Sequence, residues 1–248
     1  MIYWDPRPEI FRLPFFDWPI LWYGVMFALG FGLGFPIFVG ILTRFLGKDQ
    51  KGKAIQITDR LTLYMIFGTV IGARLGHFLF YEDPAHYLHH PAEIFRIWEG
   101  GLASHGAVVG IMVALFLFSL RIRRVAPRLD WLRLLDFVSI PAALAGGCIR
   151  IGNFINQEIL GTPSNLPWAV VFGHPADRSL PLPRHPVQIY EALFYFAVFF
   201  FLWRLSFRKF FLETRGKLIG LFLILVFGFR FLIEYLKLEQ SHLMAPSI

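Results

Sequence analysis

The chain has 248 residues, of which 56% are hydrophobic, 18% are aromatic and only 17% are charged. An average soluble domain has a smaller apolar share and a larger charged share, so this composition excludes a soluble globular protein. The single cysteine, Cys148, excludes an internal disulfide bond and a cysteine-based metal site.

Apolar segments of about 20 residues recur along the chain, and each is long enough to cross about 30 Å of hydrocarbon at 1.5 Å per residue. The sequence therefore predicts an all-α, polytopic helical membrane protein with one integral domain over residues 1–248. The six predicted spans are 18–42, 61–81, 102–120, 134–154, 189–207 and 216–236. The first 17 residues carry charges of both signs, unlike a cleaved signal peptide, so we expect the first span to remain as an anchor.

The net charge of +7 is concentrated in short connections between the spans. Fifteen of the 24 Lys and Arg residues lie in 44–60, 121–133 and 204–217. By the positive-inside rule these connections face the cytoplasm, and the N-terminus and the loops 81–101 and 156–188 face outward. Because topology alone accounts for the charge, no nucleic-acid partner is needed. Contact of the basic connections with anionic lipid headgroups is the alternative.

Three arginines fall inside or at the edge of a predicted span: Arg74, Arg150 and Arg230. A charged side chain near the bilayer centre costs at least ~2.5 kcal/mol, so such residues usually face a polar cavity or a partner. The predicted orientation puts Arg150, Arg230 and Glu234 toward the outer ends of spans four and six. It puts Tyr23 and His105 near the outer beginnings of spans one and three. We therefore expect these side chains at one depth, just below the outer surface.

Span four ends in the polar sequence IRIGNFINQEILG, residues 149–161. Arg150 and Asn153 are three residues apart and share a helix face, which Asn156 or Gln157 would continue if the helix persists. An arginine with amide groups on one stripe suits a phosphate or a phosphodiester. A structural polar seam between helices explains the same pattern equally well.

Span three opens with EGGLASHGAVVG, residues 99–110. Ser104 and His105 are adjacent and do not share a helix face, and the sequence has no G-x-S-x-G elbow, which argues against a serine nucleophile. His105 among small residues fits a general base, since imidazole changes protonation near neutral pH. A structural histidine is the common alternative for a lone His on a helix.

Two further segments carry weaker signals. In RHPVQIYE, residues 184–191, Gln188, Tyr190 and Glu191 enter the outer membrane interface, where tyrosines are common simply as belt residues. In span six, Arg230 and Glu234 are four residues apart, so they fit either a polar site or an intrahelical ion pair.

Five motifs together resemble the prolipoprotein diacylglyceryl transferase family of bacterial inner membranes. They are LWYG at 21–24, GGLASHG at 100–106, GCIRIGNFINQEILG at 147–161, HPVQIYE at 185–191 and GFRFLIEYLK at 228–237. The resemblance implies transfer of the diacylglyceryl group of phosphatidylglycerol to the lipobox cysteine of a preprolipoprotein. The products would be a thioether and glycerol phosphate.

The resemblance also implies functional residues. Members of the family rely on positions that match Tyr23, His105, Arg150, Asn153, Glu158, Gly161, Arg230 and Glu234. We interpret His105 as the base that takes the thiol proton, and Arg150 and Arg230 as a clamp on the phosphate. Glu158 and Glu234 would orient the arginines or bind the glycerol hydroxyls, or one of them would be the base. Substrate binding is expected of Tyr23, Asn153, Asn156, Glu158, Gly161, Glu234, His185, Gln188 and Tyr190.

The implied partners are phosphatidylglycerol and the signal peptide of a preprolipoprotein with its lipobox cysteine. The implied location is the bacterial inner membrane, with the active site toward the outer face. We expect a monomer without a metal or other cofactor, because the chemistry requires neither. The family usually has seven spans, whereas this chain ends at SHLMAPSI after the sixth, which would put both termini outside.

Two alternatives from other functional classes remain at this point. An anion or lipid transporter or channel would use Arg74, Arg150 and Arg230 as a polar pathway, and spans interrupted by glycine near a midplane site would favour it. The polar residues here gather toward the outer side, and the two halves show no evident repeat. An intramembrane hydrolase is the second alternative, and its nucleophile motif is missing.

Overall fold

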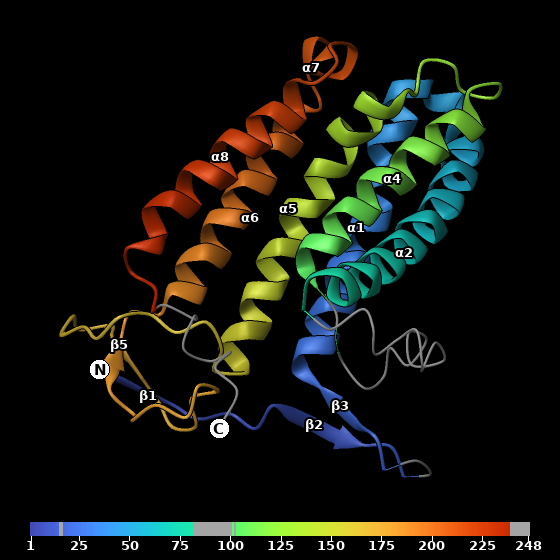
Figure 1. Ribbon diagram of the computed structural model, residues 1–248. Helices are drawn as coiled ribbons and strands as arrows, with labels where there is room; N and C mark the ends of the chain where they lie inside the picture. Colours follow the sequence, from blue (N-terminus) through green and yellow to red (C-terminus); the bar gives the residue numbers. More distant parts are fainter. Residues whose placement is uncertain (15–16, 82–100, 102, 239–248) are drawn as a thin grey trace. The chain divides into compact units, whose positions relative to one another are not determined.

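The computed structural model of the chain describes residues 1–14, 17–81, 101 and 103–238 (Figure 1). Long helices make up most of these residues, which confirms the predicted all-α polytopic class. The predicted outer loop 81–101 lies almost entirely outside the described residues.

Each predicted span coincides largely with one helix. The helices are α1 (Trp22–Leu46), α2 (Lys51–Tyr81), α4 (Ser104–Ile122), α5 (Trp131–Ile155), α6 (Val187–Leu205), α7 (Lys209–Glu213) and α8 (Lys217–Glu234), with a short 3-10 turn η1 (Lys48–Gln50). The strands are β1 (Ile2–Trp4), β2 (Glu9–Arg12), β3 (Pro19–Leu21), β4 (Val170–Phe172) and β5 (Pro183–Arg184).

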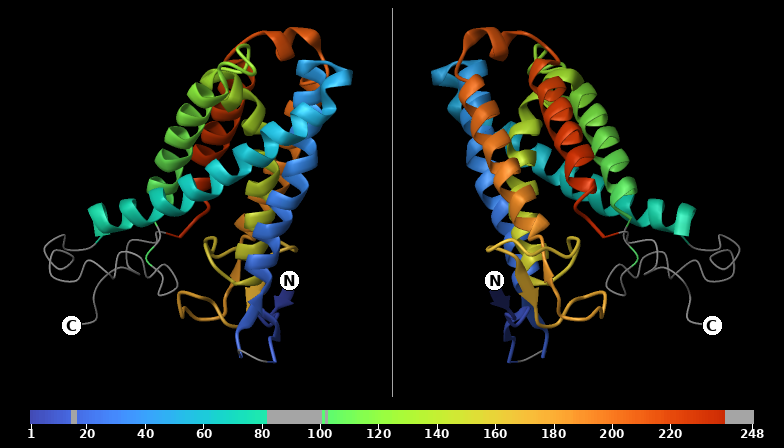
Figure 2. Two further views of the ribbon diagram at one scale, coloured as in Figure 1. Left: turned by 90° about the vertical axis from the view of Figure 1, so that its right-hand side faces the viewer. Right: turned by 90° about the vertical axis from the view of Figure 1, so that its left-hand side faces the viewer.

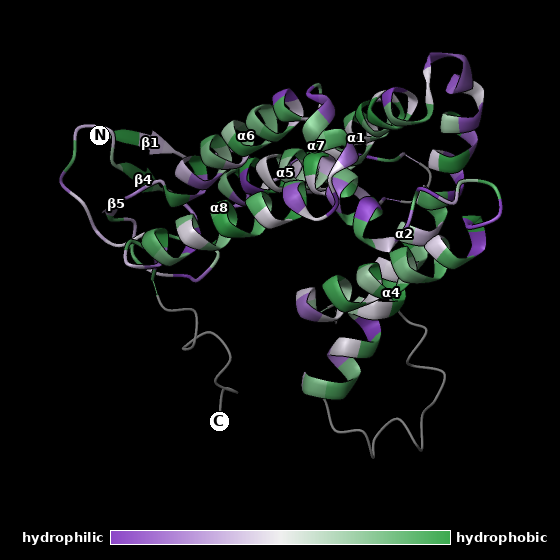
Figure 3. Cartoon of the chain, turned by 90° about the horizontal axis from the view of Figure 1, so that it is seen from above, coloured by the Kyte–Doolittle hydropathy of each residue, from purple (hydrophilic) through white to green (hydrophobic). Residues whose placement is uncertain are grey.

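Five of the described helices are long and apolar enough to cross a membrane, judged by length and composition: α1, α2, α4, α5 and α6. The sixth predicted span is the helix α8, whose 18 residues include the three charged residues Lys217, Arg230 and Glu234. The prediction of six spans therefore stays a prediction. Coloured by hydropathy, the long helices are mostly hydrophobic, and hydrophilic residues gather toward their ends and connections (Figure 3).

Two helices begin at other residues than the predicted spans, whose bounds stay a prediction. The second helix begins at Lys51 instead of 61, because Ala54, Ile57 and Leu61 recur with helical spacing and are buried. The first helix begins at Trp22 instead of 18, because the chain from Pro19 pairs as β3 with β2 in an antiparallel ladder. The residue before a proline is disfavoured in a helix, which is consistent with the later start.

The described chain divides into two compact units, and each is described by itself. Unit 1 contains residues 1–41 and 136–248, and unit 2 contains residues 42–135. The prediction of a single domain over 1–248 stays a prediction.

In unit 1, side chains and backbone tie the helices together at several levels. The rings of Phe194 on α6 and Phe229 on α8 stack with centroids 3.9 Å apart. Asp136 is fully buried on α5, and its carboxylate accepts hydrogen bonds from the backbone N–H groups of Gly216 at 2.6 Å and Ile219 at 2.9 Å. Asp136 thus caps the N-terminus of α8 from another helix, where the helix dipole favours a negative charge.

The strands of unit 1 form two small sheets (Figures 1 and 2). The three-stranded sheet lies beside the ends of α5 and α6, and the pair β2–β3 lies at the beginning of α1. β4 lies between β1, which is parallel to it, and β5, which is antiparallel. Trp4 packs on Phe154 at the end of α5, with ring centroids 4.7 Å apart, and donates a hydrogen bond from Nε1 to the Phe154 carbonyl at 3.1 Å. This contact fixes the N-terminal segment over the end of α5.

In unit 2, α2 and α4 pack along a seam of small residues. A Cβ atom added to Gly72 would lie 2.4 Å from the carbonyl oxygen of Gly106, and one added to Gly110 would meet the backbone of Gly68. No side chain larger than hydrogen fits at these positions without moving the helices. Small residues at such contacts let membrane helices approach closely.

Candidate functional site

The end of α5 carries the polar stripe that the sequence predicts. Arg150 donates a hydrogen bond from Nη1 to Asn153 Oδ1 at 3.3 Å, and Asn153 donates from Nδ2 to Glu158 Oε2 at 3.3 Å. The Arg150 side chain is 13% exposed. Within the described part of the chain, no hydrogen-bond partner is found for Arg150 Nη2. One side of this buried guanidinium is therefore available to a ligand.

The chain turns sharply where α5 ends at Ile155, so the helical stripe does not continue as a helix. Gln157 and Ile159 both have a φ of 55°, a left-handed conformation that is strained for these side chains. The turn brings Asn156 Nδ2 to 2.6 Å from Glu158 Oε1. Gln157 instead donates to Asp5 Oδ1 at 3.0 Å, outside the stripe. Glu158 thus holds two amide side chains, those of Asn153 and Asn156.

Glu191 and Lys237 complete this network, and the sequence analysis did not single out either as a site residue. Glu191 Oε2 lies 3.1 Å from Arg150 Nε, and Glu191 Oε1 accepts a hydrogen bond from Lys237 Nζ at 2.8 Å. The exposed side-chain fractions are 3% for Glu191 and 7% for Lys237. A carboxylate shared by two cations is the arrangement that allows such burial. Both residues stand at the ends of motifs quoted above, which was the available signal.

The roles proposed for Glu158 and Glu234, orienting the arginines, binding the glycerol hydroxyls or acting as the base, stay predictions; Glu158 reaches Arg150 only through Asn153. Glu191 forms the ion pair with Arg150, and Glu234 Oε2 lies 3.5 Å from Lys237 Nζ. Arg230 and Glu234 are both exposed on α8, and within the described residues no ion pair joins them. The intrahelical pair considered from the sequence is therefore not formed.

Three other predicted site residues support the loop after α5. Gln188 is fully buried and donates from Nε2 to the Glu158 carbonyl at 2.6 Å, and its predicted contact with substrate stays a prediction. Gly161 is packed so closely that an added Cβ would lie 2.3 Å from the His185 carbonyl oxygen. His185 Nδ1 lies 3.4 Å from the Tyr190 hydroxyl.

Two aromatic side chains lie at the edges of this cluster. Tyr23, at the beginning of α1, packs on Gly152, where an added Cβ would lie 2.9 Å from the tyrosine ring. It is also within electrostatic range of Arg150 and Glu158. Tyr190 accepts a hydrogen bond from Trp168 Nε1 at 2.8 Å. Within unit 1, then, Tyr23, Arg150 and the segment after α8 lie close together, and their common depth in the membrane stays a prediction.

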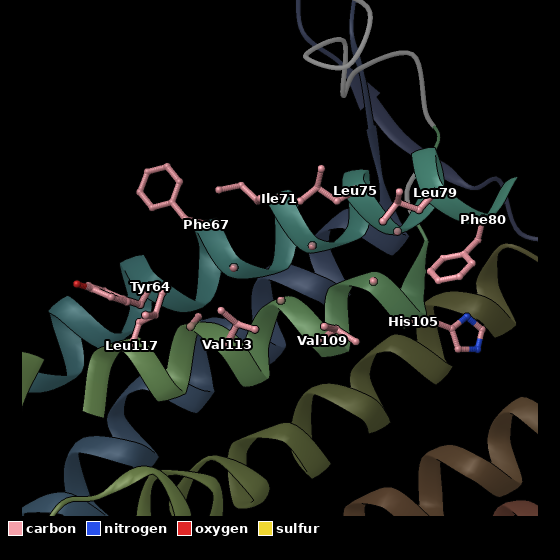
Figure 4. Close-up of a pocket in the computed structure, with 16 residues that line it drawn as sticks. Tyr64, Phe67, Ile71, Leu75, Leu79, Phe80, His105, Val109, Val113 and Leu117 are labelled. Carbon is pink, nitrogen blue, oxygen red and sulfur yellow. The ribbon is translucent and has the colours of Figure 1, made fainter. Parts of the chain in front are cut away.

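His105 belongs to unit 2, where it lies exposed in the first turn of α4. It stands near Phe80 at one end of an apolar groove of about 830 Å³ between α2 and α4 (Figure 4). Phe67, Ile71 and Leu75 line one wall of this groove. Arg74 on α2 is buried and donates from Nη1 to the Gly101 carbonyl at 3.1 Å, a structural role.

Comparison with known proteins identifies the family. The family model described as "Prolipoprotein diacylglyceryl transferase" matches residues 8–248. The chain belongs to the prolipoprotein diacylglyceryl transferase family. Relatives named phosphatidylglycerol–prolipoprotein diacylglyceryl transferase include those of Tolumonas auensis, 45% identical over 97% of this chain and 86% of the relative, and Chloroherpeton thalassium, 43% identical over 97% and 83%. The relative from Protochlamydia amoebophila is 36% identical over 100% of this chain and 89% of its own length. A family of transferases gives no support to the transporter alternative.

Proposed function

We propose that this chain transfers the diacylglyceryl group of phosphatidylglycerol to the lipobox cysteine thiol of a preprolipoprotein. The family match over residues 8–248 supports the reaction class. The structural observation that carries the proposal is Arg150, a nearly buried guanidinium fixed on its Nε side by Glu191, with no partner at Nη2 within the described residues. Such a group suits the phosphate of a lipid headgroup.

The reaction requires a base and a site for negative charge. The thiol loses its proton, its sulfur forms a bond to the terminal glyceryl carbon, and the bond from that carbon to the phosphate oxygen breaks. The phosphodiester monoanion leaves as glycerol phosphate with a second negative charge developing on its phosphate. A positioned cation stabilises that developing charge more in the transition state than in the bound substrate.

Arg150 is proposed to supply that stabilisation. The ion pair with Glu191 on the Nε side and the hydrogen bond from Nη1 to Asn153 Oδ1 set the orientation of the guanidinium. Lys237 shares the charge of Glu191, so Glu191 can hold Arg150 without cancelling its charge fully. Asn156 and Asn153, both held by Glu158, offer further polar contacts to the headgroup.

Arg230 and Glu234 are proposed to act at the exposed side of the cluster. Both lie near the end of α8, and Glu234 stands beside Lys237. An exposed arginine with no ion pair in the described chain keeps its full charge for an incoming phosphate. Glu234 is suited to accept hydrogen bonds from the glycerol hydroxyls.

His105 remains the proposed base for the thiol proton. Its imidazole is exposed at the beginning of α4, where small residues leave room for a substrate. Neutral imidazole accepts a proton near physiological pH. Glu158 is the alternative base, but its carboxylate is already engaged by two amides.

The proposed setting is the bacterial inner membrane, with the basic connections cytoplasmic and the Arg150 cluster toward the outer face. A phospholipid headgroup in the outer leaflet and a cysteine just past a signal-peptide helix would meet at this depth. The protein is proposed to act as a monomer. The proposed chemistry requires no metal or cofactor.

The test is transfer of labelled diacylglyceryl from phosphatidylglycerol to a lipobox peptide by the purified protein. Arg150→Ala should lower kcat/KM by about 10²–10³, the usual effect of removing one positioned donor. Arg204→Ala, an arginine outside the cluster, is the control and should retain activity. Near-normal transfer by Arg150→Ala would refute the clamp. Absence of transfer by the folded wild-type protein would refute the proposed function.

A further inference from the structure

A second polar pocket lies in unit 2, between the beginning of α2 and the end of α4. Its volume is about 260 Å³. Lys53, Gln56 and Arg60 reach it from α2, and Arg121 reaches it from α4. Positions 53, 56 and 60 recur at helical spacing and therefore share one face of α2. Three cations and an amide thus converge on one pocket.

The base of the pocket is apolar. Ile57, Phe118 and Ile122 line it, and all three are buried, with Phe118 at 0% exposure. An apolar base beneath a ring of cations matches an amphipathic ligand that has a charged headgroup and a hydrocarbon tail. A purely solvated basic face would need no such pocket.

Within the described residues, no carboxylate forms an ion pair with Lys53, Arg60 or Arg121. The carboxylate nearest in sequence is the exposed Asp59, and adjacent residues on a helix point ~100° apart, so Asp59 does not face the pocket with Arg60. The positive-inside rule explains how many basic residues these connections contain. It does not explain why residues of two helices surround one cavity without a counter-charge.

The depth of the pocket fits a lipid headgroup. Arg60 directly precedes the predicted span 61–81, and Arg121 directly follows the predicted span 102–120. Both arginines therefore stand at the same membrane interface. By the charge rule that interface is the cytoplasmic one, opposite to the proposed level of transfer.

We propose that this pocket binds the phosphate headgroup of an anionic phospholipid in the cytoplasmic leaflet. Lys53, Arg60 and Arg121 bind the phosphate, and Gln56 donates to it or to a headgroup hydroxyl. The glyceryl part and the first carbons of the acyl chain pack on Phe118 and Ile122. The site is separate from the Arg150 cluster and does not depend on the proposed reaction.

The experiment compares two variants of the full chain that lose the same charge from the same connections. The pocket variant is Lys53→Gln/Arg60→Gln/Arg121→Gln. The control variant is Lys48→Gln/Arg123→Gln/Arg124→Gln, whose residues are exposed and do not line the pocket. Native mass spectrometry counts bound dioleoylphosphatidylglycerol, with dioleoylphosphatidylcholine as the zwitterionic probe. Binding at the Arg150 cluster is common to both variants and cancels in the comparison.

The pocket variant should bind one anionic lipid fewer at low lipid concentration, with affinity for that lipid reduced by roughly tenfold to a hundredfold. The control variant should bind as the wild type does, and phosphatidylcholine binding should change in neither. Thermal unfolding in detergent verifies that both variants are folded. If the triple pocket variant does not fold, the three single substitutions are tested instead. Transfer at saturating phosphatidylglycerol should be unchanged.

Three outcomes would overturn the proposal. Equal losses in the pocket and control variants would mean that net charge alone attracts the lipid. Unchanged binding by the folded pocket variant would mean that the pocket is not the site. If inorganic phosphate occupied the pocket without lipid and displaced the lipid fully, the ligand would be a free anion instead of a phospholipid.

Discussion

Replacing Glu191 by glutamine tests how Arg150 is held. Glu191→Gln preserves the size of the side chain and removes its charge. In the wild type, the carboxylate lies 3.1 Å from Arg150 Nε and 2.8 Å from Lys237 Nζ. A glutamine has one carbonyl oxygen, which accepts from one of the two cations, and an NH₂ group, which is a donor and is therefore repelled by the other. The substitution therefore replaces the carboxylate between the two cations by one neutral acceptor, and leaves the exposed Glu234, 3.5 Å from Lys237 Nζ, as the carboxylate beside Lys237.

The size of the effect follows from burial. The exposed side-chain fractions are 13% for Arg150, 3% for Glu191 and 7% for Lys237, so solvent screens this network little. Removing one partner of a buried ion pair costs about 3–5 kcal/mol. We expect Glu191→Gln to lower the free energy of unfolding by about 3 kcal/mol. We also expect kcat/KM for diacylglyceryl transfer to fall by about 10²-fold, because the guanidinium loses its fixed orientation.

A double-mutant cycle separates the electrostatic role from simple packing. Adding Lys237→Met to Glu191→Gln removes one of the two cations that have lost the Glu191 carboxylate, so the double variant should be more stable than the sum of the single effects predicts. A coupling of about 1–3 kcal/mol is the usual range for residues in one ionic network. Unfolding in detergent measures the stabilities, and the lipobox-peptide assay measures transfer.

Lys209→Met is the matched control. Lys209 also pairs with a glutamate, Glu213, but at 3.9 Å and with a side chain that is 85% exposed. Exposed pairs contribute about 0–1 kcal/mol, so this variant should unfold and react almost as the wild type does. If Glu191→Gln transferred at a rate within about threefold of wild type, or if the cycle showed no coupling, Glu191 would not position Arg150.

Further predictions concern the supports of the fold. Asp136→Ala should lower the free energy of unfolding by about 1–2 kcal/mol, because the N-terminus of α8 loses its cap. An unchanged melting temperature would contradict this role. Gly72→Ala should lower the free energy of unfolding by about 1–3 kcal/mol, since its Cβ would lie 2.4 Å from the backbone of α4. The control Gly52→Ala, in open space on the same helix, should be neutral or stabilising, and equal effects of the two substitutions would refute the close packing of α2 on α4. Hydrogen bonds from His174 and Gln157 lower the pKa of Asp5 below its ordinary value of 3.8. The ionised carboxylate therefore stabilises the fold above that pH, and this stabilisation is lost as the pH falls through the lowered folded-state pKa. Asp5→Asn should be less stable than wild type at neutral pH, and acidification should remove the difference in melting temperature.

The sequence predicted the helices because their signals are local. A run of apolar residues marks a membrane helix wherever it lies, and the contact of Arg150 with Asn153 follows from their spacing on α5. The helix bounds differ from the predicted span bounds where a second signal overlaps the first. Basic residues after Leu46 suggested a connection, although Ala54, Ile57 and Leu61 already have the spacing of a buried helix face. The small strands were missed because three-residue segments have too few positions for a recognisable alternation.

The contacts that support the candidate site join residues far apart in the chain. Glu191 and Lys237 are separated by 46 positions, and Asp136 and Gly216 by 80. Hydropathy marks each of these residues as an exception within or beside an apolar segment, but it does not say which exceptions pair. Burial selects the partners: a carboxylate that is 3% exposed must meet cations, and the cations within reach depend on which helix ends meet. In a membrane protein, a charged residue at the end of an apolar segment should therefore be compared with every oppositely charged residue predicted at the same depth. For Arg150 this comparison gives a short set of acidic candidates, Glu158, Glu191 and Glu234. The close packing of α6 on Gly146 and Gly147 of α5 selects Glu191 from them.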